Sequence, residues 1–218
     1  MSFGGFPDEG LIFYEGLEAD NSKAYWSRHK EVYEAAVKAP MLALLEELSG
    51  EFGVSHLFRP HRDVRFGKDK SPYKTHQGAY FRGAGDGIGY YVQFDADGLF
   101  AGAGWYTPAP DQVERFRAAV DDEKKGERLA AVLDELTAAG LTVEGDRLKT
   151  RPRGFGDGHP RLDLLRHRSL HVGRRWHPED WLHTPEALDR VRLLWRSTSD
   201  LVDWLGTHVG PTDMPRRR

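Results

Sequence analysis

The chain contains no cysteine among its 218 residues. This absence excludes disulfides, cysteine-ligated zinc, iron–sulfur clusters and a thiol nucleophile. Long apolar runs are missing as well, since the longest, at residues 41–45, is far shorter than the roughly 20 residues that span a membrane. The first residues also lack the basic start and apolar stretch of a signal peptide. We therefore expect a soluble, cytoplasmic protein with no membrane partner.

Residues that build a core are plentiful. The chain has 6 Trp, 8 Tyr and 11 Phe, and 39% of its residues are hydrophobic. Such a composition excludes disorder throughout the chain. No internal repeat and no break in composition divides the sequence. We therefore predict a single domain over residues 1–218, in which residues 211–218 form a flexible tail.

Helix-type periodicity occurs before and after the central strands. Apolar side chains recur at steps of three and four and predict a helix over residues 23–48, kinked or split at Pro40. Shorter helical patterns lie at residues 9–17, 113–120, 129–136, 160–167 and 191–205.

Strand-type alternation fills the middle of the chain. Strands are predicted at residues 61–66, 79–81, 88–94, 99–105 and 169–172. Asp97-Gly98 predicts a hairpin turn, and residues 141–150 a small hairpin of their own. The strands follow one another instead of alternating with helices. The pattern is therefore typical of the α+β class, with a central, mainly antiparallel sheet packed against helices from both ends of the chain.

The net charge of -3 conceals two basic segments. Residues 59–76 contain six Lys/Arg and two Asp, a balance of +4. Residues 147–175 contain nine Lys/Arg and two Asp, a balance of +7, so the rest of the chain carries -14. Charge clusters of this kind indicate partners rather than folds.

The first basic segment carries a family resemblance. The run Arg62-Asp-Val-Arg-Phe-Gly-Lys-Asp-Lys-Ser-Pro-Tyr-Lys74 resembles the signature of a bacterial family of conserved hypothetical proteins, the domain of unknown function 2461. Gly67 stands where the family more often has serine, which puts any role of a hydroxyl there in doubt. Further similar runs are Asp20-Asn-Ser-Lys-Ala-Tyr-Trp26, Gly89-Tyr-Tyr-Val92, Gly102-Ala-Gly-Trp105 and Arg151-Pro-Arg-Gly-Phe155. The resemblance implies one domain spanning the chain, and the family has no agreed activity.

Charge and spacing point to a bound anion. Arginine forks match phosphate or carboxylate, and lysine adds a point charge. We predict that the two basic segments build a site for a small anionic ligand, a phosphate or a nucleotide. Its predicted anion-binding residues are Arg62, Arg65, Lys68, Lys70, Tyr73, Lys74, Arg151, Arg153 and His159. Asp63 or Asp69 would orient the cations or act as a catalytic base.

Two other interpretations stay open. In the first, the protein is a nucleic-acid-binding module whose aromatic side chains stack bases, although its net charge of -3 disfavours this. In the second, the basic motif is an internal ion-pair network, and function lies in a protein–protein interface. The sequence does not decide whether the protein is an enzyme, and a phosphate-ester or nucleotide-directed activity is the first choice if it is. No cofactor and no metal site is predicted, and a divalent cation is expected only together with a bound phosphate.

Overall fold

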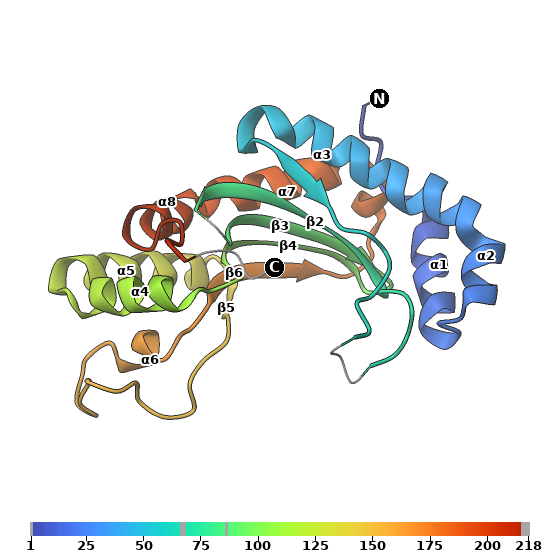
Figure 1. Ribbon diagram of the computed structural model, residues 1–218. Helices are drawn as coiled ribbons and strands as arrows, with labels where there is room; N and C mark the ends of the chain where they lie inside the picture. The colour runs from blue at the N-terminus through green and yellow to red at the C-terminus, as the bar shows by residue number, and fades with distance from the viewer. Residues whose placement is uncertain (1, 66–68, 86, 215–218) are drawn as a thin grey trace. The chain divides into compact units, whose positions relative to one another are not determined.

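The computed structural model describes residues 2–65, 69–85 and 87–214. Six strands form one sheet in the order β1-β2-β3-β4-β6-β5 (Figure 1). The strands are β1 (Ser55–Leu57), β2 (His76–Gly85), β3 (Ile88–Asp95), β4 (Gly98–Trp105), β5 (Thr142–Glu144) and β6 (Leu170–Trp176). β1 pairs antiparallel with β2, and β5 pairs antiparallel with β6. The α+β class and the antiparallel meander of the middle strands are confirmed.

Helices precede and follow the strands of the meander. The α-helices are α1 (Asp8–Ala19), α2 (Lys23–Val32), α3 (Ala39–Phe52), α4 (Pro110–Asp121), α5 (Glu123–Ala138), α6 (Leu162–Leu165), α7 (Glu186–Ser197) and α8 (Ser199–His208). A π-helix, η1 (Tyr33–Lys38), joins α2 to α3, and a 3-10 helix, η2 (Asp180–His183), precedes α7. Within the described part of the chain, no helix is both long and apolar enough to cross a membrane.

The predicted helix over residues 23–48 is divided just before Pro40. Ser22 caps its start by accepting a hydrogen bond from the Tyr25 N–H at 3.1 Å. Pro40 has no N–H to donate to the carbonyl four residues earlier. The chain widens into η1 before this proline, and the N–H of Ala39 bonds to the carbonyl of Glu34, five residues back. A π turn of this kind is rare and occurs frequently at functional sites.

Two strand predictions were wrong. The described residues of 61–66 form no strand, and only a bridge between His61 and Tyr73 is present. The carbonyls of Pro60 and Pro72 accept the main-chain bonds beside this bridge, but neither proline can donate, so no ladder extends from it. Likewise, β5 does not fold back on its own neighbours. It pairs with β6, which is distant in sequence, and a hairpin signal does not report such a partner.

The chain divides into two compact units. Unit 1 is Met1–Phe81, Tyr91–Ala101 and Arg175–Leu193, and unit 2 is Arg82–Tyr90, Gly102–Arg174 and Leu194–Arg218. β2, β3 and β4 each contribute residues to both units. The prediction of a single domain stays a prediction. The basic segment 59–76 belongs to unit 1, and almost all of the segment 147–175 belongs to unit 2, so each segment is described within its own unit.

Each unit has its own set of fully buried aromatic side chains. In unit 1, the rings of Phe6 and Phe94 stack with their centres 4.4 Å apart. In unit 2, the rings of Trp105 and Phe116 lie 5.6 Å apart. Phe94 of β3 and Trp105 of β4 thus lie in the cores of unit 1 and unit 2, respectively.

Candidate anion-binding site

The 59–76 segment forms a loop whose base is closed by main-chain hydrogen bonds. The N–H of Arg62 donates to the carbonyl of Pro72 at 2.9 Å, and the N–H of Lys74 donates to the carbonyl of Pro60 at 2.8 Å. These bonds define the base of the loop, residues 60–62 and 72–74, and they hold Lys74 there. The described residues between them, 63–65 and 69–71, are called the tip.

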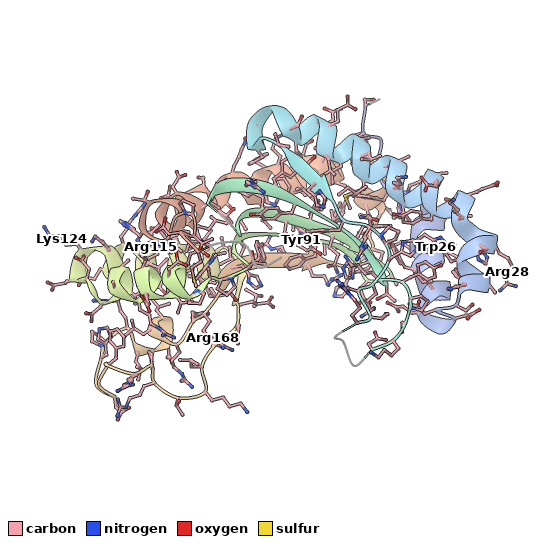
Figure 2. All side chains as sticks on the ribbon, in the orientation of Figure 1. Trp26, Arg28, Tyr91, Arg115, Lys124 and Arg168 are labelled. Atoms are coloured by element: carbon pink, nitrogen blue, oxygen red, sulfur yellow. The ribbon has the colours of Figure 1, made fainter. Side chains whose placement is uncertain are left out.

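Tyr73 anchors the base of this loop to the amino-terminal helices. The side chain of Asn21 accepts a hydrogen bond from the N–H of Tyr73 at 3.1 Å and donates one to its carbonyl at 3.0 Å. The Tyr73 ring stacks on Trp26 of α2 with the ring centres 4.3 Å apart. Trp26 is labelled in Figure 2. Tyr73 is 6% exposed, so it positions Lys74 from within the core.

At the tip, Asp63 and Arg65 bind each other. The guanidinium donates to both carboxylate oxygens, at 3.0 and 2.7 Å, and the Arg65 N–H also donates to Asp63 at 3.2 Å. These hydrogen bonds hold the pKa of Asp63 well below its ordinary value. Both side chains are solvent-exposed, so the pair contributes little to stability.

Asp69 organises the other side of the tip. It accepts hydrogen bonds from the N–H and hydroxyl of Ser71, at 2.9 and 2.6 Å, and pairs with Arg62 at 2.8 Å. The bonds from Ser71, more than the charge of Arg62, lower the pKa of Asp69. Lys70 donates to the carbonyl of Val64 at 2.8 Å. Lys68 lies outside the described residues.

The described charged side chains of the tip thus bond to groups of the same loop. Both predicted catalytic carboxylates, Asp63 and Asp69, have lowered pKa values and stay ionised at neutral pH. A carboxylate of low pKa is a weak proton acceptor, so neither is well suited to act as a general base. Their catalytic role stays a prediction and is not used further.

An open pocket of about 770 Å³ lies at the base of the loop. One wall comes from α2 and η1, and the other from residues 56–61 with Tyr73 and Lys74. The charged groups that line it are Lys30, Glu34, Lys38, Arg59 and Lys74. Among the described lining residues Glu34 is the one carboxylate, and it accepts a hydrogen bond from Lys38 at 2.7 Å. The pocket is therefore positively charged.

Lys74 stands out among these cations. No carboxylate of the described residues pairs with it, and its Nζ lies 5.1 Å from the centre of the Phe58 ring. Burial lowers the pKa of Lys74, and the positive charges of Arg59 and Arg62 lower that pKa further. Lys30 and Arg59 likewise form no ion pair in the described part of the chain, although the charge of Arg59 contributes to the low pKa of Asp63. An anion in the pocket would offset this repulsion.

A polar network on the sheet lies within the same unit. The guanidinium of Arg175 donates to both oxygens of Asp95 at 2.7 and 3.0 Å, and Gln93 donates to Asp95 at 2.6 Å. Tyr91, labelled in Figure 2, donates to Gln93 at 2.7 Å. Burial, followed by the charge of Asp95, raises the pKa of Tyr91 to about 12. The Asp95–Arg175 ion pair thus joins β3 to the end of β6 within unit 1.

His76 is the first residue of β2. The charges of Lys74 in the pocket and of Asp95 in the polar network both act on it. Burial lowers its pKa, the positive charge of Lys74 lowers it further, and the charge of Asp95 opposes them. His76 is therefore largely neutral at pH 7. It adds an imidazole, rather than a further positive charge, near Lys74.

In unit 2, the predicted residues Arg151 and Arg153 differ in whether an acidic side chain pairs with them. Arg151 donates to the carbonyl of Phe155 at 2.7 Å and pairs with Asp157 at 3.0 Å. Arg153 is exposed, and no acid of the described residues pairs with it. Other arginines of this segment with intramolecular acceptors are Arg161, Arg166, Arg168 and Arg174. Arg168 is labelled in Figure 2.

His159 is oriented by two neighbours in unit 2. Its Nδ1 accepts a hydrogen bond from the N–H of Arg161 at 3.0 Å. The ring proton therefore lies on Nε2, which is 3.1 Å from the carboxylate of Asp121 and donates to it. His159 thus holds the 149–160 loop against α4.

We expect the free energy of unfolding to fall as the pH is lowered from about 7 to about 5. His167 is 2% exposed, and burial lowers its pKa, although its hydrogen bond to the Ser169 carbonyl opposes that effect. The unfolded chain therefore takes up a proton at this histidine more readily than the folded chain. Urea titrations at several pH values measure the slope.

The matched variants for this prediction are His167→Phe and His177→Gln. The first should flatten the decrease in stability, and the second should leave it unchanged because His177 is exposed. Burial also lowers the pKa values of His76, His171 and His208, so the same direction is expected from them. A stability that does not change over this pH range would contradict the prediction.

A family model described as "Conserved hypothetical protein (DUF2461)" matches residues 9–204. The chain belongs to the DUF2461 family. No curated protein matches it. The matched range contains both basic segments and every residue that lines the pocket of this DUF2461 protein. Among its described residues, no cluster of three or more His, Asp or Glu is placed to hold a metal ion.

Sequence reasoning missed several residues of this DUF2461 pocket. Lys30 and Lys38 lie on one wall and Phe58 on the other, far apart in sequence. Arg59 is the first residue of the basic segment, and that position was the available signal for it. The structure brings together Tyr73 and Lys74 of the predicted set in this pocket and leaves Arg65 and Lys70 at the loop tip.

Proposed function

We propose that this protein binds a small phosphate-bearing molecule, such as a nucleotide, in the pocket beside Lys74. One observation carries the proposal: Lys30, Arg59 and Lys74 line the same pocket, and none of them forms an ion pair in the described part of the chain. Like charges held together in this way repel one another, and a bound anion removes that cost. The pocket volume of about 770 Å³ suits a ligand of nucleotide size.

Each cation has a distinct role in this proposal. Arg59 offers a planar fork for two phosphate oxygens, and Lys74 offers a compact charge on a fixed base. Lys30 approaches from α2, on the opposite wall. The rings of Phe58 and His61 lie on the wall beside them and offer apolar surface to the rest of the ligand.

The position of η1 also supports the proposal. Tyr33, Glu34 and Lys38 of this π-helix line the pocket. A π turn weakens regular helix bonding, and it is often retained where it places side chains for function. Of the two basic segments, residues 59–76 line this pocket, and a contribution from residues 147–175 stays a prediction.

We expect inorganic phosphate, pyrophosphate or AMP to raise the melting temperature of the protein. Lys74→Gln should weaken the binding of whichever of these stabilises the protein by about tenfold or more, because a charged hydrogen bond contributes about 1.5–3 kcal/mol. Thermal shift ranks the three ligands, and calorimetry gives the affinities. Lys70→Gln is the matched control, because it removes a lysine of the same loop that bonds to Val64 at the tip.

Two results would contradict this proposal. One is the absence of stabilisation by all three ligands. The other is an equal loss of affinity in Lys70→Gln and Lys74→Gln. Tight binding of a single-stranded oligonucleotide, with a steep dependence on salt and no binding of AMP, would favour the nucleic-acid interpretation instead.

A further inference from the structure

We propose that Lys74 is a reactive amine, whose Nζ forms an imine with an aldehyde or ketone that also carries an anionic group. The recognition of that anionic group rests on the proposed function, whereas the reactivity of the amine does not. The ligand class is thus narrowed from a phosphate-bearing molecule to a phosphate-bearing carbonyl compound.

The surroundings of Lys74 favour an amine that gives up its proton. A lysine paired with a carboxylate keeps its proton, because the opposite charge favours the charged form. Lys74 has no such partner among the described residues, and Arg59 and Arg62 place positive charge beside it. The cation–π contact of its Nζ with the Phe58 ring, at 5.1 Å, favours the charged amine, but burial and the two arginines outweigh it and lower the pKa of Lys74.

Charged and titratable groups reach this amine from three elements. α2 contributes Lys30, a further cation, and η1 contributes Glu34, which Lys38 already engages. β2 contributes His76, which is largely neutral at pH 7. Arg62, the second arginine near the amine, is paired with Asp69. With Glu34 engaged by Lys38, Lys30 and Arg59 leave the surroundings of Lys74 net positive, as around nucleophilic lysines activated by a second cation.

The pocket also gives a carbonyl compound access to the amine. Lys74 lines an open pocket rather than a closed core, and Tyr73, held by Asn21 and Trp26, fixes its main chain. Arg59 and Lys30 are placed to hold an anionic group of the same molecule. Binding of that group would bring the carbonyl carbon to Nζ as an effectively intramolecular reactant.

The proposed step balances without a further reactant. The lone pair of neutral Nζ attacks the carbonyl carbon, a C–N bond forms as the C=O π bond breaks, and one proton passes from nitrogen to oxygen. The C–O bond then breaks, and the hydroxyl leaves as water with the second nitrogen proton, which gives the C=N bond. One amine and one carbonyl compound yield one imine and one water, and nothing is oxidised or reduced.

The test uses pyridoxal 5′-phosphate as a phosphate-bearing aldehyde and pyridoxal as the same aldehyde without phosphate. The full chain is treated with a substoichiometric amount of each, reduced with borohydride, digested and mapped by mass spectrometry. We expect the phosphate-bearing probe to label Lys74 about tenfold more than Lys70 or Lys23, because an amine of lowered pKa has a larger neutral fraction at pH 7. Excess inorganic phosphate should reduce this labelling.

Lys74→Arg separates the two proposals, because arginine keeps the positive charge but cannot form the imine. This variant should retain stabilisation by phosphate and lose the adduct. Adducts spread evenly over the exposed lysines would overturn the inference. Stabilisation by phosphate without an adduct at Lys74 would also overturn it and would leave the proposed function standing. Equal labelling of Lys74 by both probes, without stabilisation by phosphate, would support the reactive amine and contradict the anion site.

Discussion

Replacing Asp95 with alanine is expected to lower the free energy of unfolding by about 3 kcal/mol, as when one partner of a buried ion pair is removed. Asp95 is 7% exposed and accepts two hydrogen bonds from Arg175 and one from Gln93. It also accepts the N–H of Asp97 at 3.0 Å in the β3–β4 turn. The alanine variant leaves the guanidinium partly buried without its carboxylate, and two further donors lose their acceptor.

Urea unfolding and calorimetry measure this loss. The melting temperature should fall by about 6–12 °C for a chain of this size. Asp97→Asn is the matched control, since its side chain is exposed and it lies in the same turn. An Asp95→Ala variant that is as stable as the Asp97→Asn variant would show that Arg175 finds another acceptor, and the prediction would be wrong.

Replacing Trp26 with alanine is expected to reduce stability by about 3–5 kcal/mol and to abolish stabilisation by phosphate. The indole is 8% exposed and stacks on Tyr73 at 4.3 Å. It also lies against Phe13 and Tyr33, with ring centres 5.7 and 4.8 Å away. Its removal leaves a large cavity under the base of the loop and releases the wall that positions Lys74.

Two comparisons separate the loss of the site from the loss of stability. Trp26→Phe keeps a ring against Tyr73 and should retain measurable phosphate binding with a smaller cost in stability. Leu133→Ala in α5 removes a buried side chain of unit 2 and should cost about 2–5 kcal/mol without changing phosphate affinity. Phosphate affinity that survives in Trp26→Ala, measured below its melting temperature, would contradict the assigned pocket.

The loop explains why the site residues were only partly predictable from sequence. The sequence marks residues 59–76 as basic, and part of this segment lines the pocket of the proposed site. However, the cations that are densest in sequence, Arg65 and Lys70, bond to Asp63 and to the carbonyl of Val64 within a few residues. Lys74 forms no such local bond, because the hydrogen bonds to the carbonyls of Pro60 and Pro72 keep it at the base of the loop.

Much of the fold follows from local patterns. The period of the apolar residues predicts the helices of the two ends, and the alternation at residues 88–94 and 99–105 predicts β3 and β4. Asp97-Gly98 predicts the turn between them, where Gly98 has a φ of 105° that favours glycine. The absence of cysteine and the two basic segments are likewise properties of the sequence alone.

Tertiary structure alone decided which charges remain without a partner. Ion pairs and hydrogen bonds act over a few ångströms, so a cation is neutralised only by groups that folding brings that close. Folding places Asp95 against Arg175, 80 residues away, and places Lys30 of α2 in one pocket with Arg59 and Lys74. The sequence determined that positive charge is concentrated in this protein, and the packing of α2 and η1 against the loop determined where that charge is available to a ligand.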